Sequence, residues 1–200
     1  MELHLSGEPE ADRLLSEDPL ALVIGMLLDQ QFPMERAFAS PAELARRLGV
    51  QRLDPSALAR TDPERLADLF AERPALHRYP RSMARRVQDL CAVIDEQLGG
   101  DTTALWTRPQ SGRELVDELE SLPGFGNRKA RIFCALLGKQ LGVQPPGWRE
   151  ASEPYGEEGS FRSIADVVNE ESLAEVRAVK QAVKQAAKRA ATAGGDAASR

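Results

Sequence analysis

The sequence has few aromatic residues and only two cysteines among its 200 residues. Phe, Trp and Tyr together make up 5% of the chain, whereas strand-rich domains depend on aromatic and β-branched side chains. Two cysteines are too few for a four-cysteine zinc or iron–sulfur site, and without a secretory sequence they indicate a reducing compartment. Ala, Leu and Arg recur throughout, so the composition predicts an all-α fold.

Long apolar runs are also lacking. No run approaches the roughly 20 residues that a membrane span requires, and the first residues do not form the basic segment of a signal peptide. We therefore expect a cytoplasmic, monomeric protein without a membrane partner. The two histidines, His4 and His77, are isolated in the sequence, which predicts surface positions and no metal site.

The formal net charge is −5, but the charges are distributed unevenly. Residues 1–172 carry −9, and residues 173–200 carry +4. Cations recur in this last segment at helical spacing, beside a stripe of Leu and Val. Two interpretations stay open: a terminal helix docked through its Val face, or a surface that contacts phosphates. The cations of the stripe are Arg177, Lys180, Lys184 and Lys188.

Asp or Ser stands four times directly before Pro and a helix-forming run. The side-chain oxygen can accept from the first backbone N–H groups of a helix, and Pro at the first helical position has no N–H to satisfy. The pairs are Asp18-Pro19, Ser40-Pro41, Asp54-Pro55 and Asp62-Pro63, and Glu43 completes a capping box with Ser40. They predict helices over residues 19–31, 41–48, 55–59 and 63–71.

Apolar residues at helical spacing predict three more helices, at 80–98, 112–121 and 127–141. Residues 142–163 are rich in Pro, Gly and acids without a helical period, which predicts a long irregular loop. The expected organisation is a helical domain at 1–141, this loop, a C-terminal helical segment at 164–191 packed on the domain, and a disordered tail at 192–200.

The segment that joins the last two predicted helices carries the strongest functional signal. It reads Leu122-Pro123-Gly124-Phe125-Gly126-Asn127-Arg128-Lys129-Ala130. Its glycines permit positive φ and leave no Cβ between the backbone and a ligand. The helix after it begins with free backbone N–H groups beside two cations, an arrangement that suits a phosphate. Such a site binds a nucleic-acid backbone without reading its sequence.

This hairpin resembles that of the helix-hairpin-helix (HhH-GPD) DNA glycosylase superfamily, which includes endonuclease III. Two other segments are similar to parts of the same family: the apolar helix from Asp18 to Gln31, and the helix 80–98 with its basic start. The resemblance covers residues 18–141. It implies a two-lobed, all-α protein of base excision repair that binds double-stranded DNA, with the hairpin beside a cleft.

The resemblance also implies roles for individual residues. A glutamine at the end of the family's early helix enters the gap left by a flipped nucleotide, which implies this role for Gln31, with Gln30 beside it. The hairpin would contact the DNA backbone, and a monovalent cation would bind the hairpin backbone. The implied DNA-binding residues of the hairpin are Gly124, Phe125, Gly126, Asn127, Arg128 and Lys129.

The chain departs from the family where the chemistry takes place. Arg128 occupies the position of the Schiff-base lysine, and a guanidinium with a pKa above about 12 cannot act as that amine. Lys129 lies about 100° further around the helix. The segment Gly142–Trp148 stands where the family carries its catalytic aspartate, and the four-cysteine cluster is absent. The resemblance therefore predicts no lyase activity, no iron–sulfur cluster and no other cofactor.

A replacement carboxylate would have to come from elsewhere in the chain. We expect Asp166, because the apolar segment around it could return toward the hairpin, with Glu158 as the second candidate. Glu150, Glu153 and Glu157 are the remaining acids of this region. Trp148 and Tyr155 either stack on an extruded base or pack the loop onto the domain.

Two functions stay open at this stage. The first is a monofunctional DNA glycosylase that flips a damaged or mispaired base and hydrolyses its N-glycosidic bond. The second is a catalytically inactive protein of the same fold that binds abasic or distorted DNA.

Overall fold

The computed structural model describes residues 2–197, with the side chains of these residues except Lys184, Ala187, Lys188 and residues 190–197. Within this range the chain forms α-helices and one short 3₁₀ helix, η1, and no strand, which confirms the predicted all-α class. The elements are α1 (Pro9–Glu17), α2 (Pro19–Leu28), α3 (Met34–Leu48), α4 (Pro55–Arg60), α5 (Pro63–Ala71), α6 (Pro80–Leu98), α7 (Ala104–Thr107), α8 (Gly112–Ser121), α9 (Asn127–Gln140), α10 (Trp148–Ala151), η1 (Ile164–Asp166) and α11 (Glu170–Ala197).

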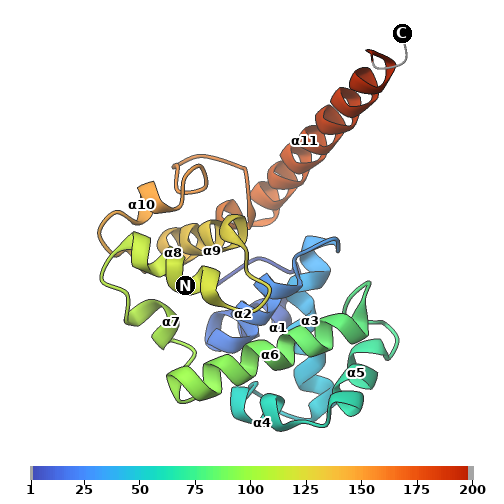
Figure 1. Ribbon diagram of the computed structural model, residues 1–200, viewed down its shortest axis with the longest axis vertical. Helices are drawn as coiled ribbons and strands as arrows, with labels where there is room; N and C mark the ends of the chain where they lie inside the picture. The colour runs from blue at the N-terminus through green and yellow to red at the C-terminus, as the bar shows by residue number, and fades with distance from the viewer. Residues whose placement is uncertain (1, 198–200) are drawn as a thin grey trace.

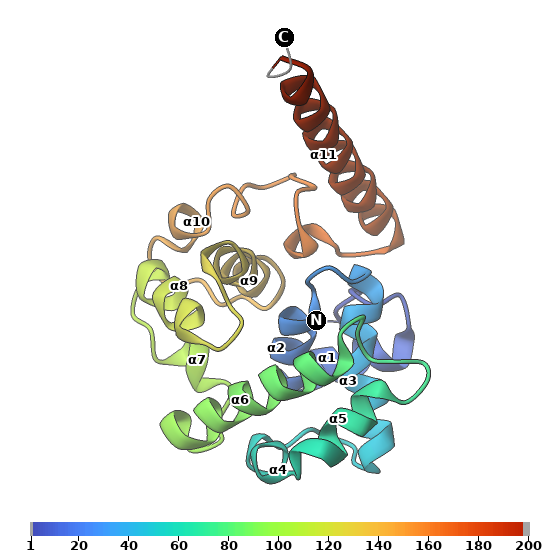
Figure 2. The ribbon, with the colours of Figure 1, turned by 45° about the vertical axis from the view of Figure 1, so that its right-hand side comes forward.

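The helices are arranged in two groups. Helices α1–α6 form one group, and α7–α10 form the other (Figures 1 and 2). In the first group α6 packs against α4 and α5, and α2 packs against α3; in the second, α8 packs against α9 and α9 against η1. Helix α11 starts beside the body and projects away from it (Figures 1 and 2). None of the described helices is long and apolar enough to cross a membrane.

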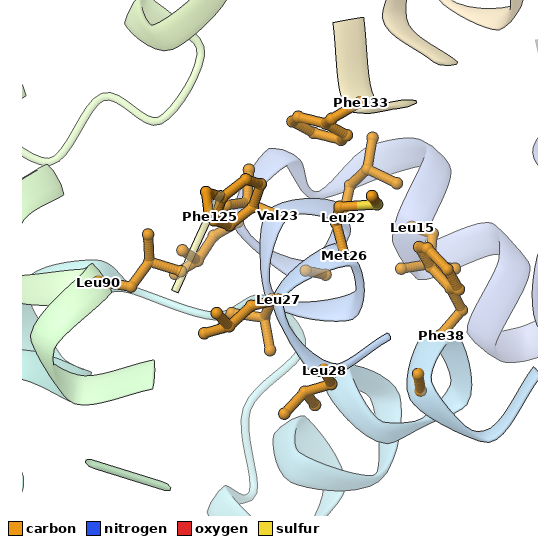
Figure 3. Packing of buried hydrophobic residues seen from close by; sticks show 14 of the residues in the cluster. Leu15, Leu22, Val23, Met26, Leu27, Leu28, Phe38, Leu90, Phe125 and Phe133 are labelled. Atoms are coloured by element: carbon orange, nitrogen blue, oxygen red, sulfur yellow. The ribbon is translucent and has the colours of Figure 1, made fainter. Parts of the chain in front are cut away.

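Helix α2 is the central element of the core. Every residue from Leu20 to Leu28 is buried, because this helix is apolar on all sides. Figure 3 shows its side chains surrounded by Phe38 of α3, Leu90 of α6, and Phe125 and Phe133 from the hairpin and α9. The two groups of helices therefore share one hydrophobic core.

The predicted Asp caps are present. The carboxylate of Asp54 accepts from the N–H of Ala57, and that of Asp62 accepts from the N–H of Arg65. Asp18, which is 4% exposed, accepts from the N–H groups of Leu20 and Ala21 and also from Leu53 N at 2.8 Å. Asp18 therefore starts α2 and ties the chain before α4 to it.

The predicted helix start at Ser40-Pro41 is wrong. Helix α3 begins at Met34, so Pro41 lies inside it. The Ser40 hydroxyl lies 2.7 Å from Arg36 O and from Leu76 O, the two acceptors available to its single proton, and it caps no helix. Met34, Ala37 and Phe38 are buried against the core, and this packing outweighs the cost of an internal proline.

Glu43, predicted to complete the capping box, serves another purpose. Its carboxylate accepts from Arg46 and Arg47 on the next turn of α3. The hydrogen bond from Arg46, with that from Arg47, lowers the pKa of Glu43 to about 2 against the effect of partial burial. Glu43 pairs with Arg46 at i, i+3 and with Arg47 at i, i+4, which are the usual spacings of ion pairs within a helix.

The predicted irregular loop contains one short helix and is packed closely. Trp148 of α10 is 7% exposed. Its ring lies against Gly138 of α9, where a Cβ would come within 2.4 Å of it, and its backbone lies equally close to Gly112 of α8. Trp148 therefore holds the loop on the domain, and the stacking role considered for it is wrong.

Helix α11 is docked on the body through its first turns. Leu173 and Val176 are buried against the body, whereas Val179 and Val183 are 38% and 63% exposed. The helix continues to Ala197, beyond the predicted tail boundary at residue 192, and residues 198–200 lie outside the described residues. Of the predicted basic stripe, the side chains of Lys184 and Lys188 also lie outside the described part.

We predict that the Asp18 cap contributes more stability than the Asp62 cap. Asp18→Ala leaves three N–H groups without their acceptor, one of them from a distant segment, so it should lower the free energy of unfolding by about 2–3 kcal/mol. Asp62→Ala, which removes one exposed cap, should cost about 0.5–1 kcal/mol. Urea unfolding followed by circular dichroism measures both, and equal losses would contradict this assignment.

Candidate nucleic-acid interface

The hairpin between α8 and α9 is a tight turn anchored by Phe125. The N–H of Phe125 donates to Leu122 O at 3.0 Å, which closes the turn. The Phe125 side chain is 5% exposed and meets Phe133 of α9 edge-on, with 6.1 Å between ring centroids. Because the aromatic ring points inward, the backbone on either side of it is left at the surface.

The two glycines of the hairpin have different roles. Gly124 has φ of +81°, and a Cβ there would lie 2.5 Å from Cδ1 of Leu27, so this position needs glycine for both conformation and space. Gly126 has φ of −95° and ψ of 169°, and a Cβ there would meet no atom within 4 Å. The fold therefore does not require glycine at 126.

Helix α9 begins without a side-chain cap. Its N-cap residue is Gly126, so the backbone N–H groups of the first turn face outward without an acceptor from that residue. The Asn127 amide donates to Glu120, and the Arg128 guanidinium donates to the Tyr155 hydroxyl at 3.1 Å. The side chains of both residues are therefore engaged with neighbouring elements, and the helix dipole favours an anion at the uncapped end of α9.

The predicted glutamine pair lies in a sharp turn after α2, because the helix ends at Leu28 and not at residue 31. Asp29 has φ of −71° and ψ of 69°, and the N–H of Gln30 donates to Leu28 O at 2.7 Å, which is an inverse γ-turn. Gln31 follows in the left-handed region, with φ of 53°. Its side chain is exposed.

Lys129 connects the hairpin to this turn. Its ammonium donates to Leu27 O at 2.6 Å, across 102 residues of sequence, and lies 5.5 Å from the centroid of the Phe125 ring. Burial lowers the pKa of Lys129 to about 8; the nearby Asp29 opposes this change and Arg86 adds to it. The hairpin and the glutamine turn are therefore adjacent parts of one surface.

His77 is buried, so its predicted surface position is wrong. The side chain is 1% exposed, and its Nε2 lies 3.0 Å from Gln30 O. Its ring packs against Phe32, with 4.7 Å between centroids. Desolvation lowers the pKa of His77, with Lys129 and Arg86 adding to the shift and hydrogen bonds to backbone carbonyls opposing it. The residue belongs to the interior side of the glutamine turn.

Asp166, the acid expected from the sequence, is occupied by the fold. Its Oδ1 accepts from Lys139 at 2.6 Å and from Ser160 at 3.0 Å. Its Oδ2 accepts from the backbone N–H groups of Arg162 and Ser163, the second of which completes a capping box at η1. The side chain is 2% exposed, so these contacts do not support the expected catalytic role.

The other predicted acids lie on the loop over α9. Glu158 is 81% exposed and pairs with Arg149 at 2.6 Å, and Glu157 pairs with Arg162 at 3.2 Å. The loop contacts the start of α9 through Tyr155, whose hydroxyl accepts from Arg128. The structure thus brings Tyr155 to the hairpin and pairs Glu158 with an arginine of its own loop.

Asp29 is a carboxylate near Lys129 that the sequence analysis did not single out. It directly follows α2, its side chain is 19% exposed, and its charge acts on Lys129. Lys180 of α11 approaches it, with 3.9 Å between Nζ and Oδ2, and also contacts Met34. The position of Asp29 directly before the glutamine pair is the sequence signal that could have revealed it.

No cluster of three or more His, Cys, Asp or Glu side chains that could hold a metal ion is present among residues 2–197. The two cysteines lie apart in the core, Cys91 on α6 and Cys134 on α9, and burial raises the pKa of Cys134 to about 12. The monovalent cation implied at the hairpin stays a prediction, and main-chain oxygens would be its ligands.

Comparison with known families agrees with this geometry. The model of the HhH-GPD superfamily base excision DNA repair protein matches residues 24–193, which is most of the chain. The chain therefore belongs to the HhH-GPD superfamily of base excision DNA repair proteins, a family that implies DNA binding. No curated protein matches the sequence closely.

We predict that the two hairpin glycines separate folding from DNA binding. Gly126→Ala should fold with the stability of the parent chain, since its φ suits alanine and the space is open. Its affinity for duplex DNA should fall about tenfold or more, because the added methyl group stands between a phosphate and the backbone N–H groups. Gly124→Ala should instead lose about 1–3 kcal/mol of stability through strain at positive φ.

Thermal unfolding and a DNA titration by fluorescence anisotropy, at one fixed salt concentration, measure the two effects. Wild-type affinity in a folded Gly126→Ala variant would exclude the hairpin as the phosphate site.

Proposed function

We propose that the protein is a monofunctional DNA glycosylase that removes a damaged or mispaired base from duplex DNA. The observation that carries this proposal is the contact between the hairpin and the end of α2. Through Lys129 and Gly124, the phosphate-binding turn lies against Leu27, four residues before Gln31. When the hairpin holds the DNA backbone, the side chain of Gln31 is close enough to enter the base stack.

Binding would begin at the hairpin. A phosphate accepts from the N–H groups at the start of α9, while the Lys129 ammonium keeps its bond to Leu27 O and holds the hairpin in place. Arg86 of α6, exposed and close to the hairpin, adds positive charge to the same surface. This fixes the register of the duplex, and an extruded nucleotide then leaves a gap that the exposed amide of Gln31 fills.

Asp29 is the carboxylate we assign to the chemical step. Cleavage of an N-glycosidic bond builds positive charge on the sugar, and a fixed anion next to that charge lowers the barrier. Asp29 directly precedes the glutamine pair in the chain and its charge acts on Lys129, whereas Asp166 is enclosed by donors and Glu158 lies on the outer loop. Water is the nucleophile, because the guanidinium of Arg128 cannot form a Schiff base.

The alternative is a protein that binds abasic or distorted DNA and has no catalytic activity. The missing family aspartate favours it, and the hairpin and Gln31 serve either function. Measurement of base release separates the two.

We predict base removal without strand cleavage. Duplexes with uracil, alkylated, oxidised or mispaired bases are incubated with the protein, and strand breaks are scored before and after alkali. At least one duplex should break only after alkali, because water leaves an intact abasic site.

Borohydride should trap no covalent adduct, with a lyase-active family member as the positive control. A trapped adduct would show that an amine acts as the nucleophile, and Lys129 is the lysine of the hairpin segment. If no duplex breaks after alkali, the result would favour the protein that binds DNA without catalysis.

We predict that Asp29→Asn reduces base release about 100-fold or more while DNA affinity changes little, because the amide keeps the shape but not the charge. Single-turnover kinetics on the duplex identified above measure the loss. Asp68→Asn, an exposed carboxylate on α5, is the matched control and should react as the parent does. A loss in Glu158→Gln or Asp166→Asn with full activity in Asp29→Asn would return the catalytic acid to the C-terminal region.

A further inference from the structure

The backbone around Gln31 is held in an unusual conformation. Gln31 is the one non-glycine residue with positive φ in the described part of the chain. A residue other than glycine in this region costs of order 1 kcal/mol or more and persists only where its surroundings hold it. The inverse γ-turn at Asp29 directly precedes it, so two tight conformations follow each other. Contacts from outside the turn must therefore hold it in place.

The two glutamines of the turn differ in what they contact. The Gln30 amide donates to Leu27 O at 2.8 Å, and its oxygen accepts from Arg86 at 3.1 Å. Gln30 is thus part of the scaffold. The Gln31 side chain is exposed and makes no hydrogen bond to any described residue. Of the pair, Gln31 is the side chain that is available to a ligand.

His77 contacts the turn from the interior of the protein and has a defined tautomer. Its Nδ1 lies 3.0 Å from the backbone N–H of Tyr79 and accepts from it. The proton of the neutral ring is therefore on Nε2, which donates to Gln30 O. The ring is also fixed from the sides, by Phe32 at 4.7 Å and Tyr79 at 6.1 Å between centroids. His77 joins two segments that are far apart in sequence, the glutamine turn and the loop that leads into α6.

We propose that His77 is the positioning residue of the DNA site, which holds the Gln30–Gln31 turn so that Gln31 points into the gap of the DNA. This inference rests on the proposed function, since it gives a role to the same surface. His77 touches neither DNA nor the reacting sugar, because it is 1% exposed. His77 fixes the conformation of the Gln30–Gln31 turn before DNA binds. The free energy of DNA binding is then not spent on ordering that turn.

The test follows the insertion of Gln31 directly and does not require base removal. A duplex carries a tetrahydrofuran abasic analogue with 2-aminopurine opposite it, and its fluorescence reports the stacking of that base. The full chain should change this signal at saturation, and Gln31→Ala should remove most of the change. His77→Phe keeps the ring volume but loses both hydrogen bonds, and it should reduce the saturating change several-fold. Its affinity for intact duplex should stay near the parent value, since the hairpin is unaltered.

The conservative variant separates positioning from folding. His77→Gln carries an amide N–H that can reach Gln30 O, so it should restore more of the saturating signal than His77→Phe. A variant that is only less stable would bind with fewer folded molecules but reach the parent signal at saturation. A full saturating signal in His77→Phe therefore overturns the role of His77 and leaves the proposed function intact. No signal from the parent chain would overturn insertion by Gln31, and the role of His77 with it.

A measurement on the parent chain covers the case in which His77→Phe does not fold. Nitrogen-15 shifts of the histidine rings distinguish the two neutral tautomers. We expect the proton of His77 on Nε2 at neutral pH, because Nδ1 accepts from the backbone N–H of Tyr79. A proton on Nδ1 would remove the hydrogen bond to Gln30 and overturn the proposal.

Discussion

The ammonium of Lys129 donates to the carbonyl of Leu27, near the end of α2, and the hairpin lies against the same turn of that helix. A helix C-terminus carries unsatisfied carbonyl groups and a partial negative charge, so a cation there is favourable. Gly124 makes the close approach to Leu27 feasible, and Phe125 fills the space behind it. The two groups of helices are joined at this contact, which sets the hairpin and the glutamine turn at a fixed separation.

The contact also explains why α2 is apolar on every side. A helix placed between the two groups has core on all its faces, and only its ends are free to carry polar residues. Asp18 caps one end, and Asp29, Gln30 and Gln31 form the other. The residues proposed to act on DNA therefore stand at the end of a helix that is buried along its whole length, and the hairpin packs against that helix.

Much of the fold followed from local rules. Asp before Pro placed the starts of α2, α4 and α5 correctly, because such a cap is satisfied within four residues and needs no tertiary contact. The same rule was wrong at Ser40, where burial of Met34 and Phe38 extended the helix past its internal proline. The hairpin glycines could be found from their spacing in the sequence. That Gly124 has no room for a Cβ, whereas Gly126 has, could not be predicted, because the neighbour of Gly124 is Leu27, which is distant in sequence.

The candidate site was predicted less completely, for the same reason. Gln31 and the hairpin are marked by motifs, whereas His77 lies 47 residues from the carbonyl it bonds and nothing in its own neighbourhood signals burial. Asp166 was chosen because an apolar segment surrounds it; the structure uses that segment to bury the carboxylate with Lys139. An ion pair formed between distant residues is visible only after the chain has folded.

The crystal structure of the protein on a duplex with a tetrahydrofuran abasic analogue tests the central claim most directly. We expect a phosphate within hydrogen-bond distance of the backbone N–H groups at the start of α9, and the Gln31 amide in the gap opposite the unpaired base. Both contacts should occur in one complex, with the Lys129 bond to Leu27 retained. DNA bound along α11, with the hairpin and Gln31 in solvent, would contradict it.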